Sequence, residues 1–160
     1  MGHHVVVALR YLVTYEPPAV VRKMHGQALM LSVRSGGRLS NILVVDDQPL
    51  VRESLRRNIQ THGHLVFEAE NVEQALIMLR DMPVDAVVLD IRLNEQSGLD
   101  VLQFIRTRPQ MAHLPVLILT AFAPTTTQQG LINEYGAMVF YKPVGLRAVL
   151  HHLTRVLTKH

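Results

Sequence analysis

The chain has 160 residues, of which 48% are hydrophobic, and a formal net charge of +3 at pH 7. This length leaves room for one sizeable core and a short appendage, but hardly for two full domains. The chain contains no cysteine, which rules out a disulfide framework or a thiolate zinc site and fits a reducing, cytoplasmic setting. Residues 1–40 hold five basic side chains against one acidic, a charge of +4, and the rest hold 11 against 12, a charge of −1. The main part of the chain therefore gives no indication of a nucleic-acid surface.

The first 40 residues differ in residue pattern from those that follow. Their longest apolar run, VVVALRYLV, is interrupted by Arg10 and falls far short of the ~20 residues that span a bilayer. It also lacks the features of a secretory signal, so no membrane location is expected. A Pro-Pro pair and the linker-like SGGRLS at 35–40 predict a boundary. We expect an N-terminal extension over 1–40 and a folded domain over 41–160. The extension is either poorly ordered, the product of an upstream start codon, or an added element that covers a surface or mediates dimers.

From residue 41 onward, short apolar runs alternate with segments of helical periodicity. Five runs rich in β-branched residues predict strands, at 41–45, 64–69, 84–89, 114–119 and 137–141. Apolar stripes predict five helices, the last with a broad apolar face over 146–157. Local signals mark their ends: Pro49 and Gly63 bound the first helix, Asn71 with Gln74 suits a capping box, Gly98 precedes the third helix, and Pro124 opens the fourth.

Strands that are apolar throughout and alternate with helices predict a parallel sheet covered on both faces. Right-handed crossovers then favour a flavodoxin-like, doubly wound α/β fold, with five strands in the order 2-1-3-4-5 and five helices. Open sheets of this kind bind ligands beyond the carboxyl ends of their strands, where the strand order reverses. The first and third strands are neighbours at that point.

Three aspartates follow these two neighbouring strands. Asp46 and Asp47 come directly after the first strand, and Asp90 comes directly after the third. Unpaired carboxylates this close would repel each other and raise their own pKa values. A hard divalent cation such as Mg²⁺ removes this difficulty, because it takes oxygen ligands and is often held by one or two carboxylates together with phosphate oxygens. Helix capping explains Asp47 equally well, but it leaves Asp46 and Asp90 unexplained.

The fourth and fifth strands add polar groups at the same edge. Thr120 ends the fourth strand with a hydroxyl that can hydrogen-bond an anionic oxygen, and Lys142 with Pro143 follows the fifth. A corner that combines a metal site with these groups suits phosphoryl transfer, where positioning and charge neutralisation supply most of the catalysis. A carboxylate at its centre would be the nucleophile and form an aspartyl phosphate.

The segments VVDD, VVLD, LTA and YKP, in this order, resemble the receiver domain of two-component response regulators over residues 41–158. The resemblance implies that Asp90 accepts a phosphoryl group from the phosphohistidine of a sensor histidine kinase or a histidine phosphotransfer protein. It implies that Lys142 pairs with the phosphoryl oxygens, that Thr120 moves toward them, and that the Lys142–Pro143 bond is cis. The Mg²⁺ ligands that it implies are Asp46, Asp47, Asp90 and the backbone carbonyl of Arg92.

The resemblance also implies how such a protein acts. A receiver of the stand-alone, chemotaxis or phosphorelay type catalyses only its own phosphotransfer and dephosphorylation, so we do not expect an enzyme. It signals to a downstream protein target through the face of the fourth helix, fifth strand and fifth helix, which allows homodimers and requires no direct DNA binding. Residues expected on that face are Gln128, Leu131, Val139 and Tyr141.

Two positions depart from the usual pattern of the family, and two more lie where the family tunes dephosphorylation. Val139 stands three residues before the lysine, where Tyr or Phe is usual, so either Phe140 takes that role or the aromatic switch is absent; we favour absence, because adjacent strand residues face opposite ways. Asn94 replaces a common proline, which we expect to loosen the loop modestly. Arg92 and Phe122 lie where the family tunes dephosphorylation, and an apolar Phe122 predicts a long-lived phosphoryl state.

Two other functions remain open at this point. A degenerate receiver would act as an interaction module that never receives phosphate, which the Val139 departure allows and the complete set of site residues argues against. A phosphatase-like hydrolase would use Asp90 as nucleophile, but Arg92 stands where such enzymes carry a second acidic residue. The nine histidines, including the pair at 151–152 and those at 62 and 64, are expected to be solvated surface residues and not a metal site.

Overall fold

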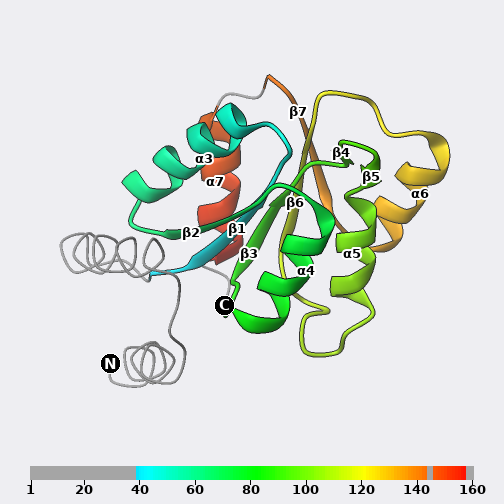
Figure 1. Cartoon of the computed structure of the whole chain (residues 1–160), viewed down its shortest axis with the longest axis horizontal. Coiled ribbons are helices and arrows are strands. Elements are labelled where there is room, and N and C mark those ends of the chain that lie inside the picture. Colours follow the sequence, from blue (N-terminus) through cyan, green and yellow to red (C-terminus); the bar gives the residue numbers. More distant parts are fainter. Residues whose placement is uncertain (1–38, 144–145, 158–160) are drawn as a thin grey trace.

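A computed structural model describes residues 39–143 and 146–157, and the element labels below are those of Figure 1. Its main sheet consists of β1 (Asn41–Val45), β2 (Leu65–Ala69), β3 (Ala86–Leu89), β6 (Val116–Thr120) and β7 (Met138–Tyr141). These strands are parallel and lie in the order β2-β1-β3-β6-β7. In chain order this is 2-1-3-4-5, so the predicted topology is confirmed.

Within the described residues, five helices cover the sheet. Figure 1 shows that they lie in two layers. The helices are α3 (Pro49–Thr61), α4 (Val72–Asp81), α5 (Leu99–Arg106), α6 (Thr126–Glu134) and α7 (Leu146–Leu157). One apolar cluster joins the sheet to α4, α5 and α6, and the other joins it to α3 and α7. The side chains of β1, β3 and β6 alternate between the two clusters, which is why these strands are apolar throughout.

Local sequence signals place most of the helix ends. Helix α3 begins at Pro49, and Gly63, at a φ of 83°, lies just after its end. The side chain of Asn71 accepts a hydrogen bond from the Gln74 amide at the start of α4. Helix α6 begins at Thr126, two residues later than predicted, because Thr125 and Gln128 form a capping box that the sequence reading missed.

A short hairpin that was not predicted follows β3. It pairs β4 (Arg92–Leu93) with β5 (Gln96–Ser97) in antiparallel fashion. Asn94 turns the chain with a φ of 55°, a conformation that asparagine tolerates better than most residues. The Gln96 side chain accepts a hydrogen bond from the Val72 amide, which ties the hairpin to the start of α4.

The predicted N-terminal extension falls almost wholly outside the described residues. Its last residue, Ser40, is buried, and its carbonyl accepts a hydrogen bond from the Leu65 amide at 2.9 Å. Ser40 is therefore already part of the folded domain. Within the part of the chain that the structure describes, no helix is both long and apolar enough to cross a bilayer.

Two histidines correct the expectation that all of them are solvated. His152 on α7 is buried, and its ring lies 5.5 Å from that of Phe140, measured between centroids. His64, just before β2, is half-buried, and burial lowers its pKa. The apolar face of α7 is broad enough to take in His152 as well as its aliphatic residues.

Candidate functional site

The three predicted aspartates meet at the carboxyl edge of the sheet. Asp46 and Asp90 are only 2% and 4% exposed, and Asp47 is half-buried. One carboxylate oxygen from each can be chosen so that all three lie within 4.8 Å of one another. The backbone fixes this arrangement, because the Asp46 amide donates to the Ala69 carbonyl at 3.1 Å and the Asp90 amide to the Val45 carbonyl at 2.8 Å. Parallel neighbours β1 and β3 thus deliver their carboxylates to one point.

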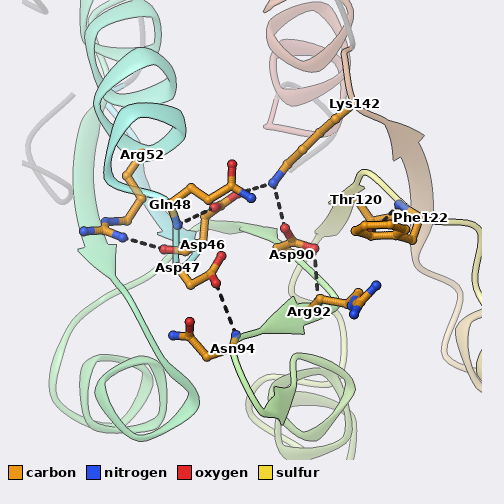
Figure 2. A network of polar contacts seen from close by, with 10 residues as sticks. All are labelled: Asp46, Asp47, Gln48, Arg52, Asp90, Arg92, Asn94, Thr120, Phe122 and Lys142. Carbon is orange, nitrogen blue, oxygen red and sulfur yellow. Dashed lines mark hydrogen bonds and ion pairs between the residues drawn. The ribbon is translucent and has the colours of Figure 1, made fainter.

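Lys142 reaches this cluster from the other side, as Figure 2 shows. Its Nζ lies 2.6 Å from Asp46 Oδ2 and 2.7 Å from Asp90 Oδ2. The Lys142 amide donates to the Thr120 carbonyl at 2.8 Å. This hydrogen bond fixes the Lys142 backbone beside the end of β6. The Lys142–Pro143 peptide bond is cis, as the resemblance implied. The structure thus brings together the predicted carboxylates and the predicted ammonium group.

Burial and charge shift the pKa values of this group in ways that follow from the geometry. Burial raises the pKa of Asp46 above 3.8, although Lys142 and the Gln48 amide both act to lower it. Burial by itself would lower the pKa of Lys142. Its hydrogen bonds and ion pairs with Asp46 and Asp90 outweigh that effect and raise the pKa above 10.5. The ammonium therefore stays protonated at neutral pH.

Backbone amides occupy the remaining carboxylate oxygens. Asp46 Oδ1 accepts from the Gln48 amide at 2.9 Å, and Asp90 Oδ1 accepts from the Arg92 amide at 3.1 Å. Arg92 thus lies at the site through its N–H, while its carbonyl as a metal ligand stays a prediction. These hydrogen bonds orient each carboxylate.

Asn94 makes two contributions to the loop that a proline could not make. Its amide donates to Asp47 Oδ2 at 3.2 Å, and its φ is 55°. A proline could adopt neither feature, because it has no N–H and its φ is fixed near −65°. The hairpin after β3 therefore gains a link to the third carboxylate where a loss of rigidity was expected.

Thr120, Phe122 and Arg92 lie next to the carboxylates and Lys142. Thr120 is buried, and its hydroxyl oxygen accepts from the Phe122 amide at 3.4 Å. The Phe122 side chain is 57% exposed, and the Arg92 guanidinium lies 4.2 Å from the centre of its ring. This distance is that of a cation–π contact. Arg92 and Phe122, which lie two residues after Asp90 and Thr120, therefore form a stacked pair.

The strand register clarifies the aromatic positions near Lys142. Phe140 pairs with Leu119 and packs in the cluster under α7, so its ring lies on the face of the sheet opposite to Thr120. Tyr141 pairs with Thr120 and is about half exposed. Val139 packs against the other cluster. The register supports the interpretation that Phe140 does not replace the missing aromatic residue.

Two site residues were missed from the sequence. An added Cβ on Gly98 would lie 1.9 Å from the Asp90 carbonyl oxygen, and the Gly98 amide donates to the Ile91 carbonyl at 2.7 Å. Only a glycine allows this close approach beneath the central aspartate. Arg52 of α3 contacts the Asp46 carbonyl. Neither role has a local sequence signal, since each depends on segments brought together by the fold.

The donor set fits a hard divalent cation. Asp46, Asp47 and Asp90 offer oxygen ligands in a corner where Lys142 already shows that positive charge is accommodated. Mg²⁺ is usually held by one or two carboxylates, with water or phosphate oxygens completing its shell. Among the described residues, the candidate metal cluster is built from these aspartates and includes no histidine.

Comparison with known proteins agrees with this geometry. Residues 42–154 match the family described as the response regulator receiver domain. Response regulator RR06 of Streptococcus pneumoniae is 28% identical over 120 residues, which cover 75% of this chain and 54% of that protein. A probable transcriptional regulatory protein of Picosynechococcus is 34% identical over 128 residues, which cover 75% of this chain and 50% of that protein. The chain spans about half the length of these curated relatives.

A solved structure shows the same fold. The CheY-like response regulator receiver domain protein of Methanospirillum hungatei matches with a TM-score of 0.70 at 21% identity, over 76% of this chain and 96% of that one. The fold, the convergence of the carboxylates on Lys142 and the family match over most of the chain lead to one conclusion. The chain belongs to the family of response regulator receiver domains.

Proposed function

We propose that this chain is a phosphoacceptor receiver, in which Asp90 takes a phosphoryl group from the phosphohistidine of a sensor histidine kinase or a phosphotransfer protein. One observation carries the proposal: the buried Asp90 carboxylate lies 2.7 Å from the Lys142 ammonium and beside two further carboxylates. A buried ion pair alone adds little stability over apolar packing. A phosphoryl acceptor explains why the chain keeps this costly arrangement.

The transfer is an in-line displacement at phosphorus. An Asp90 carboxylate oxygen forms the new O–P bond while the N–P bond of the phosphohistidine breaks, and its electron pair stays on the departing imidazole. Lys142 contacts Asp90 Oδ2 before the transfer and would then face the oxygens of the transferred group. The buried Thr120 hydroxyl lies at the neighbouring strand end, where a donor for those oxygens is needed.

We further propose Mg²⁺ as the cofactor, held by Asp46, Asp47 and Asp90 with the carbonyl of Arg92. When bound, it would neutralise negative charge on the group being transferred. The chain's own residues set the conditions for this step, because amides from Gln48, Arg92 and Asn94 orient the three carboxylates. Hydrolysis of the acyl phosphate would return free Asp90 and inorganic phosphate, so the protein turns over only its own modification and is not an enzyme acting on a separate substrate.

The signal would leave through the face of α6, β7 and α7. Leu131 and Tyr141 are exposed there, whereas Gln128 is engaged in capping α6 and Val139 is half-buried. A downstream protein that reads this face would respond to the new charge beside Thr120 and Lys142, since phosphorylation favours whichever state satisfies the added oxygens better.

Acetyl phosphate with Mg²⁺ tests the proposal. We expect the wild-type protein to gain one phosphoryl group that is acid-stable and base-labile, measured by intact-protein mass spectrometry. Asp90→Asn should gain none, because an amide oxygen is a poor nucleophile here. Asp100→Asn is the matched control, because Asp100 is an exposed aspartate in the first turn of α5, and it should react like the wild type.

Each alternative function predicts a different outcome. Rapid release of many equivalents of phosphate without accumulation of the phosphorylated protein would identify a hydrolase, and no modification at all would identify a phosphate-independent interaction module. Modification that persists in Asp90→Asn would show that another residue is the acceptor. Any of these three results would overturn the proposal.

A further inference from the structure

The side chain of Arg52 contacts the backbone at the heart of the site. Arg52 lies in the first turn of α3, and its Nη1 donates to the Asp46 carbonyl oxygen at 2.7 Å, as Figure 2 shows. Its side chain is only 15% exposed. Asp46 is thereby held at both of its backbone groups, because its amide donates to the Ala69 carbonyl.

The sheet explains why this carbonyl needs a partner. In a parallel ladder, each strand alternately donates to and accepts from its neighbour, so the carbonyl of Asp46 would accept from the next amide of an extended β2. Strand β2 ends at Ala69. The guanidinium of Arg52 takes the place of that missing amide, and a charged donor makes a stronger hydrogen bond than a neutral one.

Two glutamates lie beside the guanidinium. Arg52 Nε lies 3.9 Å from Glu68 Oε1, and Nη2 lies 3.9 Å from Glu70 Oε2. Because a guanidinium is planar and carries several donors, it can face α3, β1 and β2 at once, whereas a lysine ammonium acts as a single point charge. The glutamates also offset the charge of Arg52 beside the acidic cluster.

We propose that Arg52 is a positioning residue for the metal and phosphoryl site. By fixing the Asp46 carbonyl it fixes the peptide that joins Asp46 to Asp47, and hence the directions in which their carboxylates leave the chain. The inference rests on the proposed function for its consequence, but the positioning itself is a property of the protein alone. Loss of a hydrogen bond that orients a metal ligand commonly lowers metal affinity by about 10–100-fold.

The sign of the effect separates positioning from simple electrostatics. If Arg52 acted only as a nearby positive charge, its removal would strengthen Mg²⁺ binding. If it orients the carboxylates, its removal weakens Mg²⁺ binding. The two roles therefore predict opposite shifts in the same measured quantity.

Arg56 offers a matched control on the same helix. It pairs with Glu68 at 3.1 Å and Glu53 at 3.9 Å and contacts Gln60, so its removal also deletes a positive charge and an ion pair with β2. Within the described residues, its contacts are with Glu53, Gln60 and Glu68 and not with the backbone of Asp46. Arg52→Met and Arg56→Met thus remove similar groups, but only the first removes the carbonyl contact.

The experiment titrates Mg²⁺ into each protein by calorimetry and measures exchange of the Gln48 amide hydrogen by NMR without Mg²⁺. That amide donates to Asp46 Oδ1, so its exchange rate reports where the carboxylate lies. We expect Arg52→Met to bind Mg²⁺ about tenfold more weakly and to exchange this hydrogen faster. Arg52→Lys should recover part of both effects, and Arg56→Met should stay within about twofold of the wild type.

Thermal unfolding of each variant accounts for general loss of stability. Equal or tighter Mg²⁺ binding by Arg52→Met, or equal effects of the two methionine variants, would overturn the inference. If the wild type binds no Mg²⁺, the proposed cofactor fails, and the Gln48 amide then decides the positioning role: unchanged exchange in Arg52→Met would overturn it.

Discussion

The two edge strands of the sheet differ sharply in how they are covered. In β2, four of the five residues are buried beneath α3 and α4, whereas all four residues of β7 are half-buried or exposed. Helix α6, near β7, buries Ile132 and little else. The carboxylates therefore lie at the ends of well-packed strands, while the lysine enters from a lightly packed edge. Regions with few buried apolar contacts open most readily, so the lysine side is the half of the site better suited to move.

Near β7, hydrogen bonds from Arg106 join segments that share few buried apolar side chains. Arg106 of α5 donates from Nε to the Tyr135 carbonyl, at the end of α6, and from Nη1 to the Leu114 carbonyl, both at 2.8 Å. Burial lowers the pKa of Arg106, but arginine remains charged at any ordinary pH. One guanidinium thus joins α5, α6 and the segment before β6.

The largest expected effect comes from a matched pair of phenylalanines. Phe67 on β2 is 6% exposed, and Phe140 on β7 is half-buried. Phe67→Ala should lower the free energy of unfolding by about 3–5 kcal/mol, the usual cost for a buried ring, and Phe140→Ala by about half of that or less. Urea unfolding measures both. Equal losses would show that the two edges are packed equally well.

A pair of glycines should give opposite signs. Gly98→Ala places a methyl group against the Asp90 carbonyl and should cost about 1–3 kcal/mol of stability and slow phosphorylation. Gly130 lies within α6, with nothing within 4 Å of an added Cβ, so Gly130→Ala should stabilise the protein by about 0.5–1 kcal/mol and leave phosphorylation unchanged. A neutral Gly98→Ala variant would contradict the close approach.

Removing the Arg106 contact should affect the β7 side alone. Arg106→Met leaves two carbonyls without their donors, at a cost of about 1–3 kcal/mol. We expect amide hydrogens of α6 to exchange faster, while those of α4 keep their rates. Exchange that rises equally in both helices would mean that Arg106 supports the whole fold and not this edge.

The smallest expected effect concerns pH at the β2 edge. Burial, and then the charge of His62, lower the pKa of His64 below 6.5, while Asp85 acts in the opposite direction. The unfolded chain therefore binds a proton at His64 more readily than the folded protein does, and stability falls as the pH drops below about 6.5. His64→Gln should lose less stability between neutral and mildly acidic pH. Identical urea-unfolding profiles across this range would contradict the assignment.

The sequence predicted the topology and the central residues of the site because these depend on local patterns. Apolar runs and helical stripes define the element order, and chirality then limits the arrangement of the strands. Asp46, Asp90 and Lys142 each follow a strand directly, so the carboxyl edge of the sheet had to collect them. The order of the strands and the geometry of a parallel sheet were therefore sufficient to predict that these three residues meet.

The features that were missed depend on contacts between distant segments. Nothing near Gly98 reveals that its backbone approaches Asp90, and nothing near Arg52 reveals that β2 ends before it can offer an amide to the Asp46 carbonyl. The hairpin at Asn94 was overlooked because its strands are two residues long, too short for any periodicity. His152 was judged polar by type, although its position on α7 faces the core.

Lys142 forms ion pairs with both Asp46 and Asp90, and this bears on how the protein folds in the absence of a ligand. The ammonium offsets the negative charge of the two carboxylates, so we expect the chain to fold without a bound metal. A chelator should accordingly leave the unfolding temperature of the purified protein nearly unchanged. Maturation and activation would then be separate events, the first governed by the chain alone and the second by what the cell supplies.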